Sequence, residues 1–196
     1  YMPFFSPTVH RTFTSRETRE LPKADSVPFC AVPQVLTNDP ENFLWAAQAC
    51  RDLGYAEINL NAGCPSGTVV AKRKGSGMLR DLDSLSDFFD RIFAKSPLPV
   101  SVKTRLGMEE PEEFEKVLAL YNRYPIRELI VHPRVRRQFY EGQVHSEWFA
   151  YAAQNSRNPL CYNGDIRSLA DIRALAEAYP QLPAVMIGRG LIADPG

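Results

Sequence analysis

Short apolar runs alternate with amphipathic stretches along the whole chain, and no linker interrupts the alternation. The apolar runs predict strands at residues 29–35, 56–60, 100–103, 128–131, 160–162 and 184–187, and residues 1–6 are a candidate remnant of one more. Helical periodicity predicts a helix capped by Asn38 or Asp39 that runs to about residue 53, and a second helix capped by Ser84. Further helices are predicted over 111–124, near Trp148 and over 168–179.

Strands that alternate with helices of this length indicate βαβ units around a parallel sheet, either an open doubly wound sheet or a barrel. Polar residues decide between them, because they follow the carboxyl ends of six successive strands, which a barrel gathers into one ring. We therefore expect an α/β fold of the (β/α)8 TIM-barrel type, with residues 1–196 forming one partial catalytic domain. A barrel has eight strands over about 250 residues, so we expect the first βα unit and the part after the last strand to be missing here. The residues at the strand ends are Gln34, Asn59, Asn61, Lys103, His132, Asn163, Gly188 and Arg189.

Composition narrows the function classes. Lys plus Arg and Asp plus Glu both total 23 in 196 residues, so attraction to a nucleic acid would have to come from a local patch. No apolar run approaches the ~20 residues of a membrane span, and we expect no signal peptide. The four cysteines lack the spacing of metal sites, so we expect no metal and reduced thiols of a cytoplasmic protein. Of these, Cys30, Cys50 and Cys161 are predicted to lie in the core.

Cys64 differs from the other three cysteines. It follows a predicted strand in the run Asn61-Ala62-Gly63-Cys64-Pro65, where Gly63 and Pro65 restrict the backbone around it. A cysteine at a strand end is often structural, but this setting favours a thiol exposed to a site.

Two more strands end in groups that can bind an anion. Lys103 and Arg105 close one strand, and His132 emerges from the next, although a solvated strand end or a structural histidine has the same pattern. After the last two predicted strands come Asn163-Gly164-Asp165 and Gly188-Arg189-Gly190. Loops at these positions are the usual phosphate site of TIM barrels, because glycine lets backbone amides approach an anion closely.

Taken together, these motifs resemble the dihydrouridine synthase family in order and spacing, over nearly the whole chain. The resemblance implies a flavin-dependent oxidoreductase that reduces the C5=C6 bond of uridines in tRNA, with FMN at the barrel mouth, hydride delivered to C6 and NADPH as the electron donor. It implies that Cys64 donates a proton to C5 and that Asn61 and Arg134 lie beside the uracil. An ordinary thiol, with a pKa of ~8.5, is protonated at neutral pH and suits that role. The implied flavin contacts are Gln34, Lys103 and His132 for the ring and ribityl chain, and Asn163, Gly164, Asp165, Gly188 and Arg189 for the phosphate end.

The family resemblance also implies a tRNA partner and a C-terminal helical domain, and we expect that domain to be missing here. Two basic segments, residues 72–74 and 134–140, are suited to tRNA phosphates, and no stable protein partner is evident. Pro133 stands where the family pattern has a glycine.

Three alternatives remain open on sequence alone. The nearest is another FMN-dependent TIM-barrel oxidoreductase acting on a small molecule, such as a dihydroorotate dehydrogenase-like enzyme or an ene-reductase. The others are a catalytically silent flavin- or RNA-binding relative, and an aldolase-type barrel that uses Lys103 as a Schiff base. The sequence specifies neither the uridine position nor the choice between NADPH and NADH.

Overall fold

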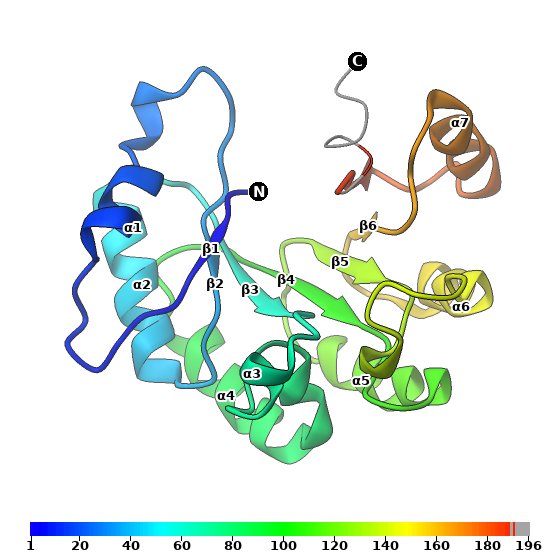
Figure 1. Ribbon diagram of the computed structural model, residues 1–196, viewed down its shortest axis with the longest axis horizontal. Helices are drawn as coiled ribbons and strands as arrows, with labels where there is room; N and C mark the ends of the chain where they lie inside the picture. Colours follow the sequence, from blue (N-terminus) through cyan, green and yellow to red (C-terminus); the bar gives the residue numbers. More distant parts are fainter. Residues whose placement is uncertain (189, 191–196) are drawn as a thin grey trace.

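The computed structural model describes residues 1–188 and Gly190. Seven parallel strands form one sheet in the order β1-β2-β3-β4-β5-β6-β7, and β1 to β6 follow one another across the molecule in Figure 1. Consecutive order without a reversal excludes the doubly wound alternative, which needs a switch point. The fold is therefore the expected α/β TIM-barrel type in partial form, and the candidate strand at residues 1–6 is confirmed as β1. The strands are β1 (Phe4–Phe5), β2 (Gln34–Val35), β3 (Ile58–Ala62), β4 (Val100–Arg105), β5 (Leu129–His132), β6 (Leu160–Tyr162) and β7 (Ala184–Val185).

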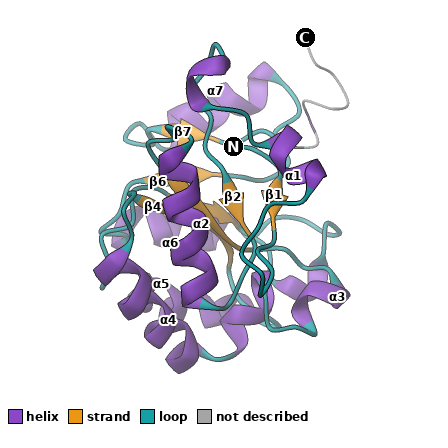
Figure 2. Cartoon of the chain, turned by 90° about the vertical axis from the view of Figure 1, so that its left-hand side faces the viewer, coloured by secondary structure: helices purple, strands orange, loops and turns teal. Residues whose placement is uncertain are grey.

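Helices cover the outer side of the sheet (Figure 2). The α-helices are α1 (Ser15–Glu20), α2 (Pro40–Asp52), α3 (Gly67–Val70), α4 (Leu82–Lys95), α5 (Phe114–Tyr121), α6 (Ser146–Asn155) and α7 (Leu169–Ala178). Short 3-10 segments lie at Ala24–Ser26, Gly75–Arg80, Pro111–Glu113 and Arg136–Gln138.

Capping residues explain where the predicted helices begin. Asp39 caps α2 by accepting from the backbone N–H groups of residues 41 and 42, with Pro40 in the first turn, as expected. Ser168 caps α7 in the same way. The predicted start at Ser84 is wrong, because α4 begins at Leu82 and Asp81 is the cap that accepts from the Ser84 N–H.

The core lies between the outer face of the sheet and the helices. On β3, Ile58, Leu60 and Ala62 are fully buried, and aromatic rings of α2, α4 and α5 pack beyond them. Phe89 of α4 stacks on Tyr121 of α5, with ring centroids 5.6 Å apart. Alternate residues on a strand face opposite sides, so this packing turns the other residues of β3 toward the inside of the barrel.

Two expectations about the segment before β2 are wrong. The predicted strand at residues 29–35 is only Gln34–Val35, and Cys30 is exposed rather than in the core. Residues 29–33 include Pro33, which cannot donate to a sheet ladder. Cys50 and Cys161 are buried, as expected.

The register of the sheet aligns the inward-facing polar residues. Gln34 pairs with Asn59, and Asn59 with Ser101. One step toward the carboxyl ends, Asn61 pairs with Lys103, and Arg105 with His132. The fold thus gathers polar side chains from four neighbouring strands at one end of the sheet.

Candidate active site

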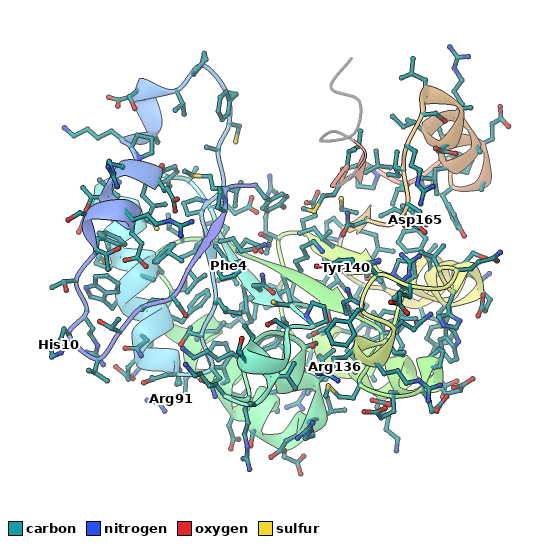
Figure 3. The ribbon with its side chains drawn as sticks, in the orientation of Figure 1. Phe4, His10, Arg91, Arg136, Tyr140 and Asp165 are labelled. Atoms are coloured by element: carbon teal, nitrogen blue, oxygen red, sulfur yellow. The ribbon has the colours of Figure 1, made fainter. Side chains whose placement is uncertain are left out.

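A cavity of about 460 Å³ opens at the carboxyl ends of the strands. In Figure 3, Phe4 on β1 lies on one side of it, and Tyr140 and Asp165 lie on the other. Nine of the eleven predicted site residues line it: Gln34, Asn61, Cys64, Lys103, His132, Asn163, Gly164, Asp165 and Gly188. Arg134 lies behind the wall, and Arg189 is outside the described residues. The structure therefore brings the predicted site together at one rim.

The Cys64 loop is fixed from two sides. The Cys64 backbone N–H donates to Asn61 Oδ1 at 2.9 Å, and the Cys64 carbonyl accepts from the Ser76 hydroxyl at 2.9 Å. Gly75 packs against the back of this loop with φ +56°, and a Cβ there would lie 2.7 Å from the Cys64 carbonyl oxygen. Cys64 is half-buried and lines the cavity, so the surrounding backbone holds it at the cavity wall.

Lys103 brings a positive charge into the cavity wall. Burial, with the nearby Arg105 guanidinium as a second cause, lowers the pKa of its ammonium to about 8. No carboxylate forms an ion pair with Lys103 in the described part of the chain. A partly desolvated cation without a protein counter-ion is suited to an anionic ligand.

The sequence indicated Arg105 as a strand-end cation beside Lys103 but assigned it no contact in the implied flavin site, although it is two positions after Lys103 on the same face of β4. It lines the cavity, donates to the Gly63 and Val135 carbonyls at 3.0 Å each, and lies 5.3 Å from the Tyr140 ring centroid. Burial lowers the pKa of Arg105 to about 10. Arg105 thus ties the Cys64 loop to the loop after β5. The period-two alternation of a strand was the signal that could have identified it.

Arg134, which is buried behind the cavity wall, forms an ion pair with Asp165, which lines the cavity. Arg134 is 1% exposed, and its guanidinium donates to both Asp165 carboxylate oxygens at 3.1 and 2.6 Å. It also donates to the Glu141 and Gly142 carbonyls. Asp165 has a positive φ of 42°, so the pair anchors both the loop after β5 and the strained turn after β6. Protein groups therefore accept the hydrogen bonds that the Arg134 guanidinium donates.

The same guanidinium sets the state of His132. Arg134 Nη1 lies 3.0 Å from His132 Nε2, and since arginine can only donate, Nε2 accepts and the ring proton resides on Nδ1. Burial first, and then the charges of Arg105, Lys103 and Arg134, hold the pKa of His132 far below its usual range. His132 is therefore a neutral donor at the cavity wall.

Two loops form the far end of the cavity. Asn163 Nδ2 donates to the Met186 carbonyl at 2.8 Å and so joins the loops after β6 and β7. A Cβ on Gly188 would meet nothing within 4 Å, whereas one on Gly164 would lie 3.1 Å from Val144. Backbone amides beside such glycines are accessible to an anion.

Among the described residues, no group of three His, Cys, Asp or Glu side chains could hold a metal ion. None of the described helices has both the length and the apolar character that crossing a bilayer requires.

The sequence is similar to a known family and to several of its members. A family model described as "Dihydrouridine synthase (Dus)" matches residues 6–196. A "Probable tRNA-dihydrouridine synthase" of Rickettsia bellii (strain RML369-C) is 31% identical over 166 residues, covering 84% of this chain and 51% of the relative. Proteins of the same description from Staphylococcus aureus (strain Mu50 / ATCC 700699) and Rickettsia prowazekii (strain Madrid E) are 34% and 30% identical, over 84% and 86% of this chain. The chain spans about half the length of these relatives, 51% in each case.

Proposed function

The chain belongs to the dihydrouridine synthase family, and from that premise we propose that it is the barrel part of an FMN-dependent tRNA-dihydrouridine synthase with Cys64 as its general acid. The family supports an oxidoreductase acting on tRNA uridines. The observation that carries the proposal is that a thiol, a partly desolvated ammonium and a neutral imidazole line the same cavity.

The cavity residues fit FMN by their chemistry. Lys103 has a charge suited to the anionic form of a reduced ring, and Gln34 and the neutral His132 offer N–H donors to ring carbonyls. The backbone at Asn163, Gly164 and Gly188 suits the phosphate end. Asp165 would belong to the phosphate end on the resemblance alone, because its carboxylate binds Arg134. Arg189 would join the phosphate group on the resemblance alone. When bound, FMN supplies the hydride, and NADPH is the proposed reductant.

The protein's part in the reaction is to orient a uracil and to deliver a proton. The Cys64 thiol donates the proton that C5 gains as C6 accepts a hydride, so two hydrogens are added across the double bond. Asn61 is the neighbour that contacts the ring. Arg134, as the anchor of the His132 and Tyr140 loop, orients the substrate side of the cavity indirectly.

Basic residues around the rim suit the phosphates of a tRNA. Lys72 and Arg73 are exposed after α3, and the Lys74 ammonium lies 3.5 Å from the Ser6 hydroxyl. Arg136 lies 4.9 Å from the ring centroid of Phe139, which is 40% exposed. Cations beside exposed aromatic rings suit RNA, because bases turned out of their stack pack on such rings.

A spectrum and a substrate comparison test the proposal. The purified protein mixed with FMN should show a perturbed flavin absorbance band, and NADPH should bleach it. Unmodified tRNA should then restore the oxidised band, whereas an enone or orotate, the oxidised partner of dihydroorotate, should not. Reoxidation by the small molecules but not by tRNA would instead favour an ene-reductase or dihydroorotate dehydrogenase-like function.

A further inference from the structure

Four buried polar side chains form a continuous hydrogen-bonded row across β2, β3 and β4, which we call the amide relay. Asn61 Nδ2 donates to Gln34 Oε1 at 2.8 Å, and Gln34 Nε2 donates to Asn59 Oδ1 at 2.9 Å. Asn59 Nδ2 then donates to Ser101 Oγ at 2.8 Å. Asn59 and Ser101 are fully buried and are not among the residues that line the cavity. Half of the relay therefore lies beneath the site, out of reach of any ligand.

The direction of the relay follows from the backbone at one end. Asn61 Oδ1 accepts from the N–H groups of Gly63 at 3.1 Å and Cys64 at 2.9 Å. A backbone N–H can only donate, so the oxygen of the Asn61 amide must face the loop and its nitrogen must face Gln34. The Gln34 amide then turns its oxygen toward Asn61, and each further partner is fixed in turn.

This arrangement limits what Asn61 can offer to a ligand. A carbonyl oxygen has two lone pairs, and both on Asn61 Oδ1 are used by the loop. What remains is one N–H of Nδ2, so Asn61 can only donate. Its partner must be an acceptor such as a ring carbonyl oxygen, as in uracil, and not an exocyclic amino group, as in cytosine.

We propose that Asn59 and Ser101 are positioning residues, which hold Gln34 in the orientation that keeps Asn61 a donor and Cys64 in place. The identity of the ring rests on the proposed function, whereas the coupling to Cys64 does not. Without Asn59, Gln34 Nε2 loses its acceptor in a buried position, and a polar group left in that state turns away or draws in water. Asn61 then loses the partner that aligns it with the Cys64 loop.

Two substitutions at Asn59, with side chains of similar size, distinguish a positioning role of this residue from a role in packing alone. Asn59→Leu removes both hydrogen bonds of the residue. Asn59→Asp keeps both, because its oxygens accept from Gln34 Nε2 and from the Ser101 hydroxyl, which rotates to donate. Ser101→Ala is the milder variant, since it removes one hydroxyl and keeps the surrounding packing.

Alkylation of Cys64 by iodoacetamide tests the proposal. Its rate is measured by peptide mass spectrometry in the absence of tRNA. Exposed Cys30 is the reference in the same sample. We expect the Cys64 to Cys30 rate ratio to change about tenfold in Asn59→Leu and about threefold or more in Ser101→Ala, and to stay within about twofold of native in Asn59→Asp. Thermal melts of each protein confirm that it is folded. Equal ratios in all four folded proteins would overturn the relay.

Turnover of tRNA by the same proteins separates the two proposals. The relay predicts that Asn59→Leu lowers kcat more than it raises KM, and that Asn59→Asp restores kcat. If alkylation follows the predicted order but the native protein forms no dihydrouridine, the proposed function fails while the relay stands. If dihydrouridine forms at native rates in Asn59→Leu, the relay fails while the proposed function stands.

Discussion

Replacing Lys103 with Met should stabilise the folded protein while weakening its hold on an anionic ligand. The pKa of Lys103 falls from its ordinary value of 10.5 to about 8, mainly because of burial and secondly because of Arg105. At ~1.4 kcal/mol for each tenfold change in the protonation equilibrium, this fall corresponds to ~3 kcal/mol of cost for the charged lysine. Since Lys103 retains some exposure to solvent, we expect a gain of roughly 1–3 kcal/mol at pH 7.

The sign of the pH dependence follows from linkage. Below pH 8 the lysine is charged in both the folded and the unfolded protein, so the full free-energy cost of burying its charge is present. As the pH rises through 8, the folded protein releases the proton and the cost declines, and it vanishes above the unfolded pKa of about 10.4. The advantage of Lys103→Met should therefore shrink below ~1 kcal/mol at pH 10.

Urea unfolding at pH 7 and pH 10 measures this difference, with Lys116→Met as the matched control because Lys116 lies exposed on α5. A titration with FMN completes the assay, and Lys103→Met should bind it at least tenfold more weakly. The reasoning is refuted if Lys103→Met is less stable than the native protein at pH 7, or if its advantage is the same at both pH values.

Three further substitutions test other parts of the site. Cys64→Ala should keep bound flavin and its reduction by NADPH but lower dihydrouridine formation by roughly 10²–10⁴-fold, and a parallel loss of flavin would indicate a structural cysteine instead. Arg134→Met should release His132 from its single tautomer, which nitrogen NMR of the three histidines can follow, and an unchanged spectrum would contradict the Arg134 to Nε2 contact. Gly75→Ala should destabilise the protein by about 1 kcal/mol or more, because φ is +56° and the new Cβ would meet the Cys64 carbonyl; an unchanged melting temperature would argue against that close approach.

The sequence predicted the positions of the candidate site residues well wherever a single strand determined them. Lys103 and His132 end strands that are recognisable from their apolar residues alone, and parallel strands place such ends on one rim. Capping preferences alone did not predict the start of a helix where two residues were both suitable N-caps. Asp81 and Ser84 are both good N-cap residues, and only the folded chain shows that Asp81 accepts from the Ser84 N–H.

Contacts between segments that are far apart in the chain could not be predicted from the sequence. Nothing in the spacing of Arg134 and Asp165, 31 residues apart, indicates that their side chains pair. The orientation of the Gln34 side-chain amide could not be predicted either, because it depends on backbone N–H groups in a loop about 30 residues later. Cys30 was misplaced because its apolar neighbours suggested a strand that begins only at Gln34.

The most direct test of the central claim is to look for dihydrouridine in tRNA. Unmodified tRNA incubated with the protein, FMN and NADPH, and then digested to nucleosides, should contain a uridine heavier by two hydrogens. Cys64→Ala protein loaded with the same amount of flavin should yield that nucleoside at no more than about 1% of the native rate. Absence of the reduced nucleoside with native protein whose flavin is reduced by NADPH would contradict the proposed function, and an equal yield from Cys64→Ala would contradict the role of Cys64.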